Sequence, residues 1–339
     1  SISGISMINF QEESPQSYNE LYEAMLKNIL FRGEHNPPTN HPFHMKYALS
    51  LCPSHLKCKI KYFSIRNQQK KVLALLHGLH VFNQQTETHS FGAEFLPAFF
   101  FENLGAIETA SISKYHQAIN YFLNRFDNVR TRDYCFGGKL SSFSTQMAVA
   151  GARLTSNYTR VVKIMDDQSE NNSKIRKSYR GLIRKFNKEG EIYVFTRKNI
   201  KNEHFKQAFE LHKTVTGHQT RPWKSWIEQL NAVKNDKAFL ILTQKQDRLI
   251  GYSYFLCNSI CSFYASAVYS KDNSGAAPAS IWQAMEHSKS TGRHAIDIGQ
   301  QNYHSDAGGD KNEKLNNISF FKRGFGGMDH VYIETYLEK

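Results

Sequence analysis

Three basic residues fall on one face of a predicted helix and have the chemistry to bind an anion. The segment SKIRKSYRGLIRKFNKEG, residues 173–190, carries apolar residues at helical spacing, with Lys177, Arg180 and Arg184 on another face. The guanidinium group of arginine bonds two phosphate oxygens at once. We therefore predict that these three residues bind a diphosphate. The alternative is an ordinary helix whose charged face is solvated.

Hydroxyl groups occur two residues apart in a predicted strand. The segment FYASAVYS, residues 263–270, has the composition of a strand and contains Tyr264 and Ser266. Because side chains alternate along a strand, we expect both hydroxyls on one face, where they would hold a polar acceptor molecule. The alternative is that they only help to form the strand.

Polar residues also lie at the end of the predicted strand HAIDIG. Asp297 and His304 are candidate catalytic residues, and Gln300 and Tyr303 are candidate substrate ligands. An imidazole titrates near neutral pH, so His304 is the candidate general base. The chain has 15 histidines, so an ordinary surface histidine is the alternative. The polar, glycine-rich segment 302–317 is either a loop that closes over substrate or a passive surface loop.

The composition predicts a folded protein with more than one domain. The chain has 339 residues, 40% hydrophobic and 13% aromatic, which is enough to build two cores. Its formal net charge is +13, which favours an anionic partner such as a phosphate, a nucleotide, a nucleic acid or an anionic lipid surface. A protein that merely has a high isoelectric point is an equally good explanation.

The cysteines and the hydropathy predict a cytoplasmic protein. The five cysteines are an odd number and indicate reduced thiols rather than a disulfide framework, with Cys257 and Cys261 as buried thiols. No zinc-binding spacing is present, so we expect no metal site. No apolar run reaches the ~18 residues of a membrane helix, although peripheral membrane contact is compatible with the charge. The first residues lack a signal peptide, and Met7 is the expected natural start.

The predicted elements describe a mixed α/β protein with no internal repeat. In the first half we expect a helix, then a hairpin, then another helix, at residues 13–30, 57–63 with 72–82, and 113–126. In the second half three consecutive strands form an antiparallel meander, and helices and single strands flank it. The polar segment 166–172 is predicted to be a linker or the lead-in to a helix. We therefore place the domains at 7–165 and 166–339.

The order of elements in the second half resembles the GNAT acyltransferase fold. The run FLILTQKQDRLIGYSYFLCNSICSFYASAVYS is followed by the loop DNSGAAPAS, the helix IWQAMEHSKSTG, the strand HAIDIG and the segment ISFFKRGFGG, residues 318–327. With YTRVVKIMDD and the basic helix, these motifs are similar to the Fem family and its FemAB-like relatives, the tandem-GNAT aminoacyltransferases of cell-wall precursors. The resemblance spans residues ~150–339 and is an outline only over 7–149. It implies two tandem GNAT-like lobes.

The resemblance also assigns roles to residues. Lys322 matches the lysine that the family's F-K-x-G-F segment directs at the reacting groups, where a cation stabilises the negative charge of the adduct. Arg323 beside it is a candidate substrate ligand, and Arg180 matches the arginine of the family's basic helix. The segment that contains Asp297, Gln300 and Tyr303 corresponds to the acceptor groove.

Two kinds of acyl donor are compatible with the resemblance. GNAT enzymes that use coenzyme A have a glycine-rich loop that binds the pyrophosphate at a helix N-terminus. Here that loop keeps only Gly275, and Pro278 stands near the helix start, so it is a poor match. Fem proteins that use aminoacyl-tRNA often carry a coiled-coil arm, for which 205–233 is too short. We therefore expect either aminoacyl-tRNA or acyl-CoA as donor, and no tightly bound cofactor.

Three functions follow. The first is transfer of an aminoacyl or acyl group to an amine of a nucleotide-linked or lipid-linked sugar or peptidoglycan-type precursor, in cell-envelope biosynthesis. The second is acyl-CoA-dependent N-acylation of another small amine. The third is a catalytically inactive protein that binds nucleic acid or another polyanion through residues 174–188. Against the third, the basic residues are not interleaved with aromatic ones, as binding of a single strand requires.

Overall fold

The computed structural model describes residues 8–31, 35–271, 275–303 and 313–339. The chain divides into two compact units, one made of residues 1–36, 40–157 and 331–339 and the other of residues 37–39 and 158–330. This division differs from the predicted boundary at 165/166 in two ways: it falls at 157/158, and Val331–Lys339 returns to the first unit. There, residues 333–338 pair antiparallel with residues 128–133.

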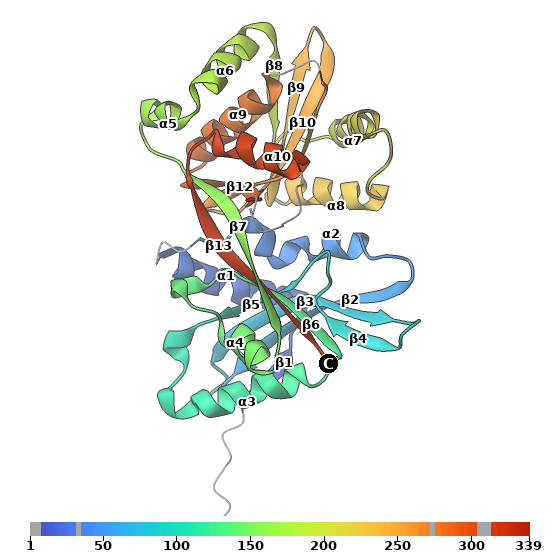
Figure 1. The fold of residues 1–339 in the computed structure, drawn as a ribbon, viewed down its shortest axis with the longest axis vertical. Helices are drawn as coiled ribbons and strands as arrows, with labels where there is room; N and C mark the ends of the chain where they lie inside the picture. The colour runs from blue at the N-terminus through green and yellow to red at the C-terminus, as the bar shows by residue number, and fades with distance from the viewer. Residues whose placement is uncertain (1–7, 32–34, 272–274, 304–312) are drawn as a thin grey trace, which may run out of the picture. The chain divides into compact units, whose positions relative to one another are not determined.

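The first unit is a mixed sheet with helices packed on it (Figure 1). Its strands lie in the order β1-β2-β3-β4-β6-β13, and β5 pairs with both β3 and β6. The predicted hairpin is confirmed, with β2 and β3 in antiparallel register from Leu56↔Asn83 to Arg66↔Val72. The elements are β1 Asn9–Glu12, α1 Pro15–Phe31, α2 Met45–Ser50, β2 Leu56–Arg66, β3 Val72–Asn83, β4 Thr88–Phe91, β5 Ala98–Glu102, α3 Ile112–Leu123, β6 Asn128–Asp133, α4 Ser142–Val149 and β13 Met328–Glu338.

Strand β3 is buried on both faces because hydrophobic cores lie on either side of it. Leu76 belongs to the core that α3 and α4 cover, whereas its neighbour Leu75 belongs to the core that α1 and α2 cover. Successive side chains on a strand point to opposite faces, which explains the unbroken apolar run VLALL.

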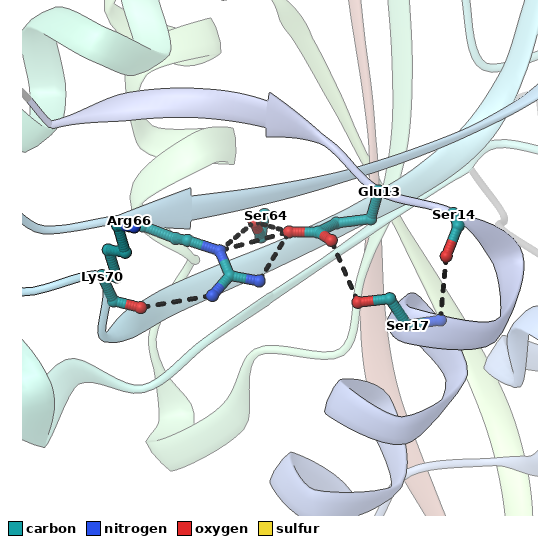
Figure 2. Close-up of polar contacts among 6 residues, drawn as sticks. All are labelled: Glu13, Ser14, Ser17, Ser64, Arg66 and Lys70. Carbon is teal, nitrogen blue, oxygen red and sulfur yellow. Dashed lines mark hydrogen bonds and ion pairs between the residues drawn. The ribbon is translucent and has the colours of Figure 1, made fainter.

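A buried ion pair holds the start of α1 against β2 (Figure 2). The Glu13 carboxylate accepts hydrogen bonds from the Nη2 atom of Arg66 at 2.7 Å and from the hydroxyl of Ser64 at 2.6 Å. Its other oxygen accepts a bond from Ser17 in the first turn of the helix. Burial opposes ionisation, but the bonds from Ser64, Arg66 and Ser17 outweigh it and lower the pKa of Glu13.

The second unit is a sheet in the order β7-β12-β11-β10-β9-β8. Its mixed α/β character and the central antiparallel meander are confirmed, with β9, β10 and β11 pairing in sequence. The elements are β7 Arg153–Lys163, α5 Gln168–Lys174, α6 Lys177–Glu189, β8 Glu191–Phe195, α7 Asn202–Thr216, α8 Trp223–Lys234, β9 Ala238–Lys245, β10 Arg248–Cys257, β11 Cys261–Tyr269, α9 Ala276–Ser290, β12 Ala295–Gln301 and α10 Glu313–Arg323.

Helices cover both faces of this sheet. On β10, Phe255 packs into the core formed with α6 and α9, whereas Tyr254 packs edge-on against Phe205 of α7. In Figure 1, α6, α9 and α10 accordingly gather on one side of the strands, with α7 and α8 on the other.

The polar segment 166–172 is the lead-in to a helix, one of its two predicted roles, because Asp167 caps α5 and the buried Asn171 side chain bonds both backbone groups of Met165. One sequence prediction is wrong. The cysteines are not all reduced, since Cys52 and Cys58 form a disulfide. The bridge closes a small loop at the start of β2. The number of cysteines alone does not reveal this pairing. Cys257 and Cys261 are free and buried, as predicted.

Candidate functional site

The candidate site begins where β11 and β12 separate. The two strands run parallel but pair only from Cys261↔Ala295 to Phe263↔Asp297, while β11 continues to Tyr269. At the same level, the pairing of β10 with β11 shifts by one residue between Tyr254 and Phe255. The two irregularities leave one edge of β11 without the pairing to β12 from Tyr264 onward.

A pocket of about 500 Å³ lies along this edge. Tyr264 and Ser266 of β11 line one side, Ala277 near the start of α9 lies at one end, and Phe321 and Lys322 of α10 line another side. The pocket thus brings together three of the residues singled out in the sequence, namely Tyr264, Ser266 and Lys322. All of its lining residues belong to the second unit.

The expectation that Tyr264 and Ser266 share a face of the strand is wrong. Ser266 pairs with Tyr254 and Tyr264 pairs with Phe255, which are neighbours on β10. The bulge at Ala265 inserts one residue and so reverses the alternation. The two side chains therefore leave the strand on opposite faces, and both residues line one pocket because it lies at the strand edge.

Lys322 lines the pocket with a half-buried side chain. Its Nζ atom donates to the backbone carbonyl of Gln300 at 3.1 Å. Desolvation lowers the pKa of Lys322, and the nearby Asp297 carboxylate partly offsets that effect. Asp297 is fully buried and accepts hydrogen bonds from the Thr159 hydroxyl at 2.6 Å and the Gly299 amide at 2.8 Å. Asp297 does not line the pocket, and its charge stabilises the protonated form of Lys322.

The segment FFKRGFGG fixes the helix that carries Lys322. A Cβ atom at Gly324 would lie 2.2 Å from the Tyr179 ring, so only glycine allows this approach to α6. The Gly324 carbonyl accepts a bond from the Arg176 amide at 2.7 Å. The Arg176 guanidinium donates to the Phe320 carbonyl at 3.1 Å and stacks over the Phe320 ring. The basic helix and the lysine motif are therefore packed together.

The other basic side chains of α6 are available to a ligand. Lys177 and Arg184 are exposed and Arg180 is half-buried. Within the described parts of the chain, no carboxylate or other hydrogen-bonding group is found with these three side chains. They do not line the pocket, so the structure does not bring them together with Lys322.

The residues after β12 form a separate polar cluster. Tyr303 donates a hydrogen bond to Asp329, which also pairs with Arg160 at 3.2 Å. Arg323 donates to the buried Gln301 side chain and lies 5.5 Å from the centre of the Tyr303 ring. Tyr303 and Arg323 thus lie outside the pocket lining, and Gln300 contributes its carbonyl to Lys322. The predicted base His304 falls outside the described residues.

Sequence reasoning missed a hydrogen-bonded chain behind the pocket. The Tyr252 hydroxyl lies 3.0 Å from the Ser266 hydroxyl and 2.7 Å from the Nδ1 atom of His212. The Nε2 atom of His212 lies 2.8 Å from the Thr220 hydroxyl. These residues come from β10, β11, α7 and the segment before α8. The histidine in α7 and the tyrosine in β10 are ordinary residues of those elements, so only tertiary structure reveals them.

The described start of α9 lacks one backbone amide donor. Pro278 is the third residue of the helix and has no N–H group to donate. A Cβ atom at Gly275 would lie 3.1 Å from the Leu182 carbonyl, so α6 packs closely against this end. No group of three or more potential metal ligands occurs within the described ranges.

The second unit is a GNAT domain by sequence as well as by fold. Residues 173–312 match the family model described as "Acetyltransferase (GNAT) domain". This match and the fold make the C-terminal unit an acyltransferase domain of the GNAT class. A search of curated proteins found no match.

The whole chain has the fold of tandem GNAT proteins. It is similar to the crystal structure of FemX, with a TM-score of 0.62 and 10% identity over 96% of each chain. It is also similar to the C-terminal domain of a putative lysylphosphatidylglycerol synthetase from Agrobacterium fabrum, with a TM-score of 0.58 and 9% identity over 95% of this chain and 93% of that one. A tandem GNAT protein of the clavulanic acid pathway matches with a TM-score of 0.55 and 9% identity over 98% of both chains. The resemblance to FemAB-like proteins is confirmed at the level of the fold.

Across the described residues, no helix is both long enough and apolar enough to cross a membrane.

Proposed function

We propose that this protein transfers an aminoacyl or acyl group to an amine of a nucleotide-linked or lipid-linked sugar or peptidoglycan-type precursor. The observation that carries the proposal is the pocket at the open edge of β11, which joins a partly desolvated lysine to hydroxyls on a GNAT scaffold. The fold similarity to FemX and to a lysylphosphatidylglycerol synthetase domain supports envelope precursors as the acceptor class.

The proposed reaction uses an activated carboxyl group and an uncharged amine. The amine nitrogen attacks the carbonyl carbon, a C–N bond forms, and the C–O bond of an ester or the C–S bond of a thioester breaks. The leaving oxygen or sulfur takes up a proton. Lys322 stabilises the negative charge that develops on the carbonyl oxygen, because a fixed cation in a site of low polarity acts strongly on such charge.

Lys177, Arg180 and Arg184 anchor the diphosphate of the acceptor. They are cationic and have no described ion-pair partner, so binding a phosphate does not require breaking an existing pair. Several such contacts would position the precursor while its amine enters the pocket.

The donor is an aminoacyl ester on tRNA or an acyl thioester of coenzyme A. The proline at the third position of α9 favours the tRNA ester, since it removes an amide donor from the coenzyme A cradle. Charged tRNA and acyl-CoA are made in the cytoplasm, which is therefore the compartment we propose.

A mass-spectrometric screen tests the proposal. Purified full-length protein is incubated with amino-sugar nucleotides and nucleotide-linked peptide precursors, once with charged tRNA and once with acetyl-CoA. We expect an acceptor whose mass increases by one acyl or aminoacyl group with one of the donors. Salt-sensitive binding of RNA with no mass increase for any acceptor would instead support the polyanion-binding function.

A further inference from the structure

We infer that Ser266, Tyr252 and His212 form a proton relay that carries the acceptor amine's proton from the pocket to the outer end of α7. The inference rests on the proposed function, because it supplies the route by which an incoming ammonium becomes a nucleophile. The Asp297 carboxylate does not supply that route, since it is fully buried and bonded to Thr159 and Gly299.

Each neighbouring pair of groups in the relay lies within hydrogen-bond distance. Ser266 lines the pocket and lies 3.0 Å from the Tyr252 hydroxyl, which lies 2.7 Å from the Nδ1 atom of His212. The Nε2 atom of His212 lies 2.8 Å from the hydroxyl of Thr220, an exposed residue. Tyr252 is 1% exposed, so water does not replace its central hydroxyl. The chain thus joins the pocket to solvent through one buried tyrosine.

Packing holds the histidine ring in place. Trp226 of α8 meets the His212 ring edge-on at 5.4 Å between centres, and the same tryptophan lies 5.6 Å from the Tyr252 ring. Because Tyr252 and Ser266 sit diagonally across the β10–β11 pair, the strand register sets their separation. The bulge at Ala265 is what turns Ser266 toward Tyr252 while Tyr264 faces the other way.

The proton transfer balances as a series of exchanges along existing bonds. The ammonium gives a proton to the Ser266 oxygen, Ser266 gives its own to Tyr252, and Tyr252 gives its own to Nδ1 of His212. The amine becomes neutral and the imidazole becomes a cation whose Nε2–H donates to Thr220. That second proton then passes to water and leaves a neutral ring protonated at Nδ1. After the product has left, Nε2 takes up a proton from water and Nδ1 returns its proton through Tyr252 and Ser266 to water in the pocket, which restores the starting tautomer.

The electrostatic surroundings of His212 keep its ring neutral, so that the ring can accept a proton. Burial lowers the pKa of His212 from 6.5, and the cations Arg221 and, when protonated, His218 lower it further. The ring is therefore neutral at pH 7. The relay requires its proton on Nε2, toward Thr220, so that Nδ1 accepts from Tyr252. As the pH falls through this lowered pKa, His212 is protonated in advance and transfer slows.

Nitrogen-15 NMR of the full chain tests the resting state without any substrate. The His212 signals are assigned by their loss in His212→Gln. We expect an Nε2–H tautomer at pH 7 that titrates below pH 6.5, and Tyr252→Phe should alter its nitrogen shifts. An Nδ1–H tautomer, or an imidazolium at pH 7, would overturn the relay.

The kinetics of acyl transfer test whether the relay acts in the reaction. His212→Gln and Tyr252→Phe should each lower kcat/KM about 100-fold at pH 7, and the double variant should lose no more than either alone. The deficit should vanish above the pKa of the acceptor amine, where no proton need leave before attack. Tyr254→Phe is the matched control, because it removes a hydroxyl two residues along β10 that bonds Gln229 instead.

A deficit that is independent of pH would contradict the relay and leave the proposed function intact. Absence of transfer in the wild-type protein would contradict the proposed function, whereas the NMR result would still decide the relay's geometry.

Discussion

The side chain of Lys322 crosses directly over Gly299, where a Cβ atom would lie 3.3 Å from its Nζ atom. Gly299 has a φ of +94° and sits beside the irregularity in the β7–β12 pairing. The lysine thus reaches the Gln300 carbonyl across a position that has no side chain.

Gly299→Ala should displace the lysine and slow acyl transfer. We expect a loss of about 1 kcal/mol in stability from the positive φ, and a fall of about 10-fold or more in kcat as Nζ moves. Gly292→Ala is the control, since its φ is +81° but no atom lies within 4 Å of the added carbon. Thermal melts and steady-state rates of both variants check this. Equal effects of the two on kcat would show that the contact is immaterial.

The basic face of α6 should control binding of the acceptor rather than chemistry. Alanine at Lys177, Arg180 or Arg184 should raise KM for a diphosphate acceptor about 10-fold each, with little change in kcat, because the phosphate contact is the same in the ground and transition states. Lys185→Ala, on another face of the helix, should change neither KM nor kcat. A KM that stays constant in all three variants, or that is insensitive to salt, would exclude these residues as the anchor.

The Glu13–Arg66 ion pair should stabilise the first unit in a pH-dependent way. Glu13 has a lowered pKa, so its contribution is present above the unfolded-state value near 4.5 and is lost as the pH falls through the folded value. Its side chain is only 6% exposed, so Glu13→Gln should cost about 2 kcal/mol at pH 7. Urea unfolding at pH 7 and pH 3 measures the difference.

Glu12 provides the comparison for that experiment. It pairs with Lys61 at the same 2.7 Å distance, but its side chain is 58% exposed. Glu12→Gln should cost less than about 0.5 kcal/mol because water screens the pair. Equal costs for the two substitutions would show that burial does not set the strength of the Glu13 pair.

The disulfide predicts a definite number of reactive thiols. Alkylation of the denatured protein without reductant should modify three cysteines, namely Cys135, Cys257 and Cys261, and all five after reduction. Cys52→Ser should lower stability by about 2 kcal/mol, since the bridge closes a short loop. Five alkylations without reductant would contradict the bridge.

The sequence was sufficient for the fold of the second unit because its elements are strongly patterned. The meander of β9 to β11 and the motif around Gly324 were each visible as alternation, turns and glycines. The first unit was harder, since β4, β5 and β6 are short and their partners lie far away in the chain. The return of residues 331–339 to the first unit could not be predicted, because β13 pairs there with β6, some 200 residues earlier in the sequence.

The candidate site was only partly predictable. Lys322, Tyr264 and Ser266 were found from motif position and strand spacing, and the structure gathers them in one pocket. The opposite directions of Tyr264 and Ser266 depend on the bulge at Ala265, which no local pattern signals. The link from Ser266 through Tyr252 to His212 depends on how α7 packs on the sheet.

The activity of a Lys322→Met variant tests the central claim most directly. Methionine keeps most of the side-chain volume and removes the cation, and Lys314→Ala on the same helix serves as a control for the loss of a lysine. With the acceptor and donor identified by the screen, we expect kcat for Lys322→Met to fall at least about 100-fold with KM and melting temperature little changed, and Lys314→Ala to turn over normally. Wild-type kcat in a folded Lys322→Met variant would contradict the claim that this lysine stabilises the charge formed during acyl transfer.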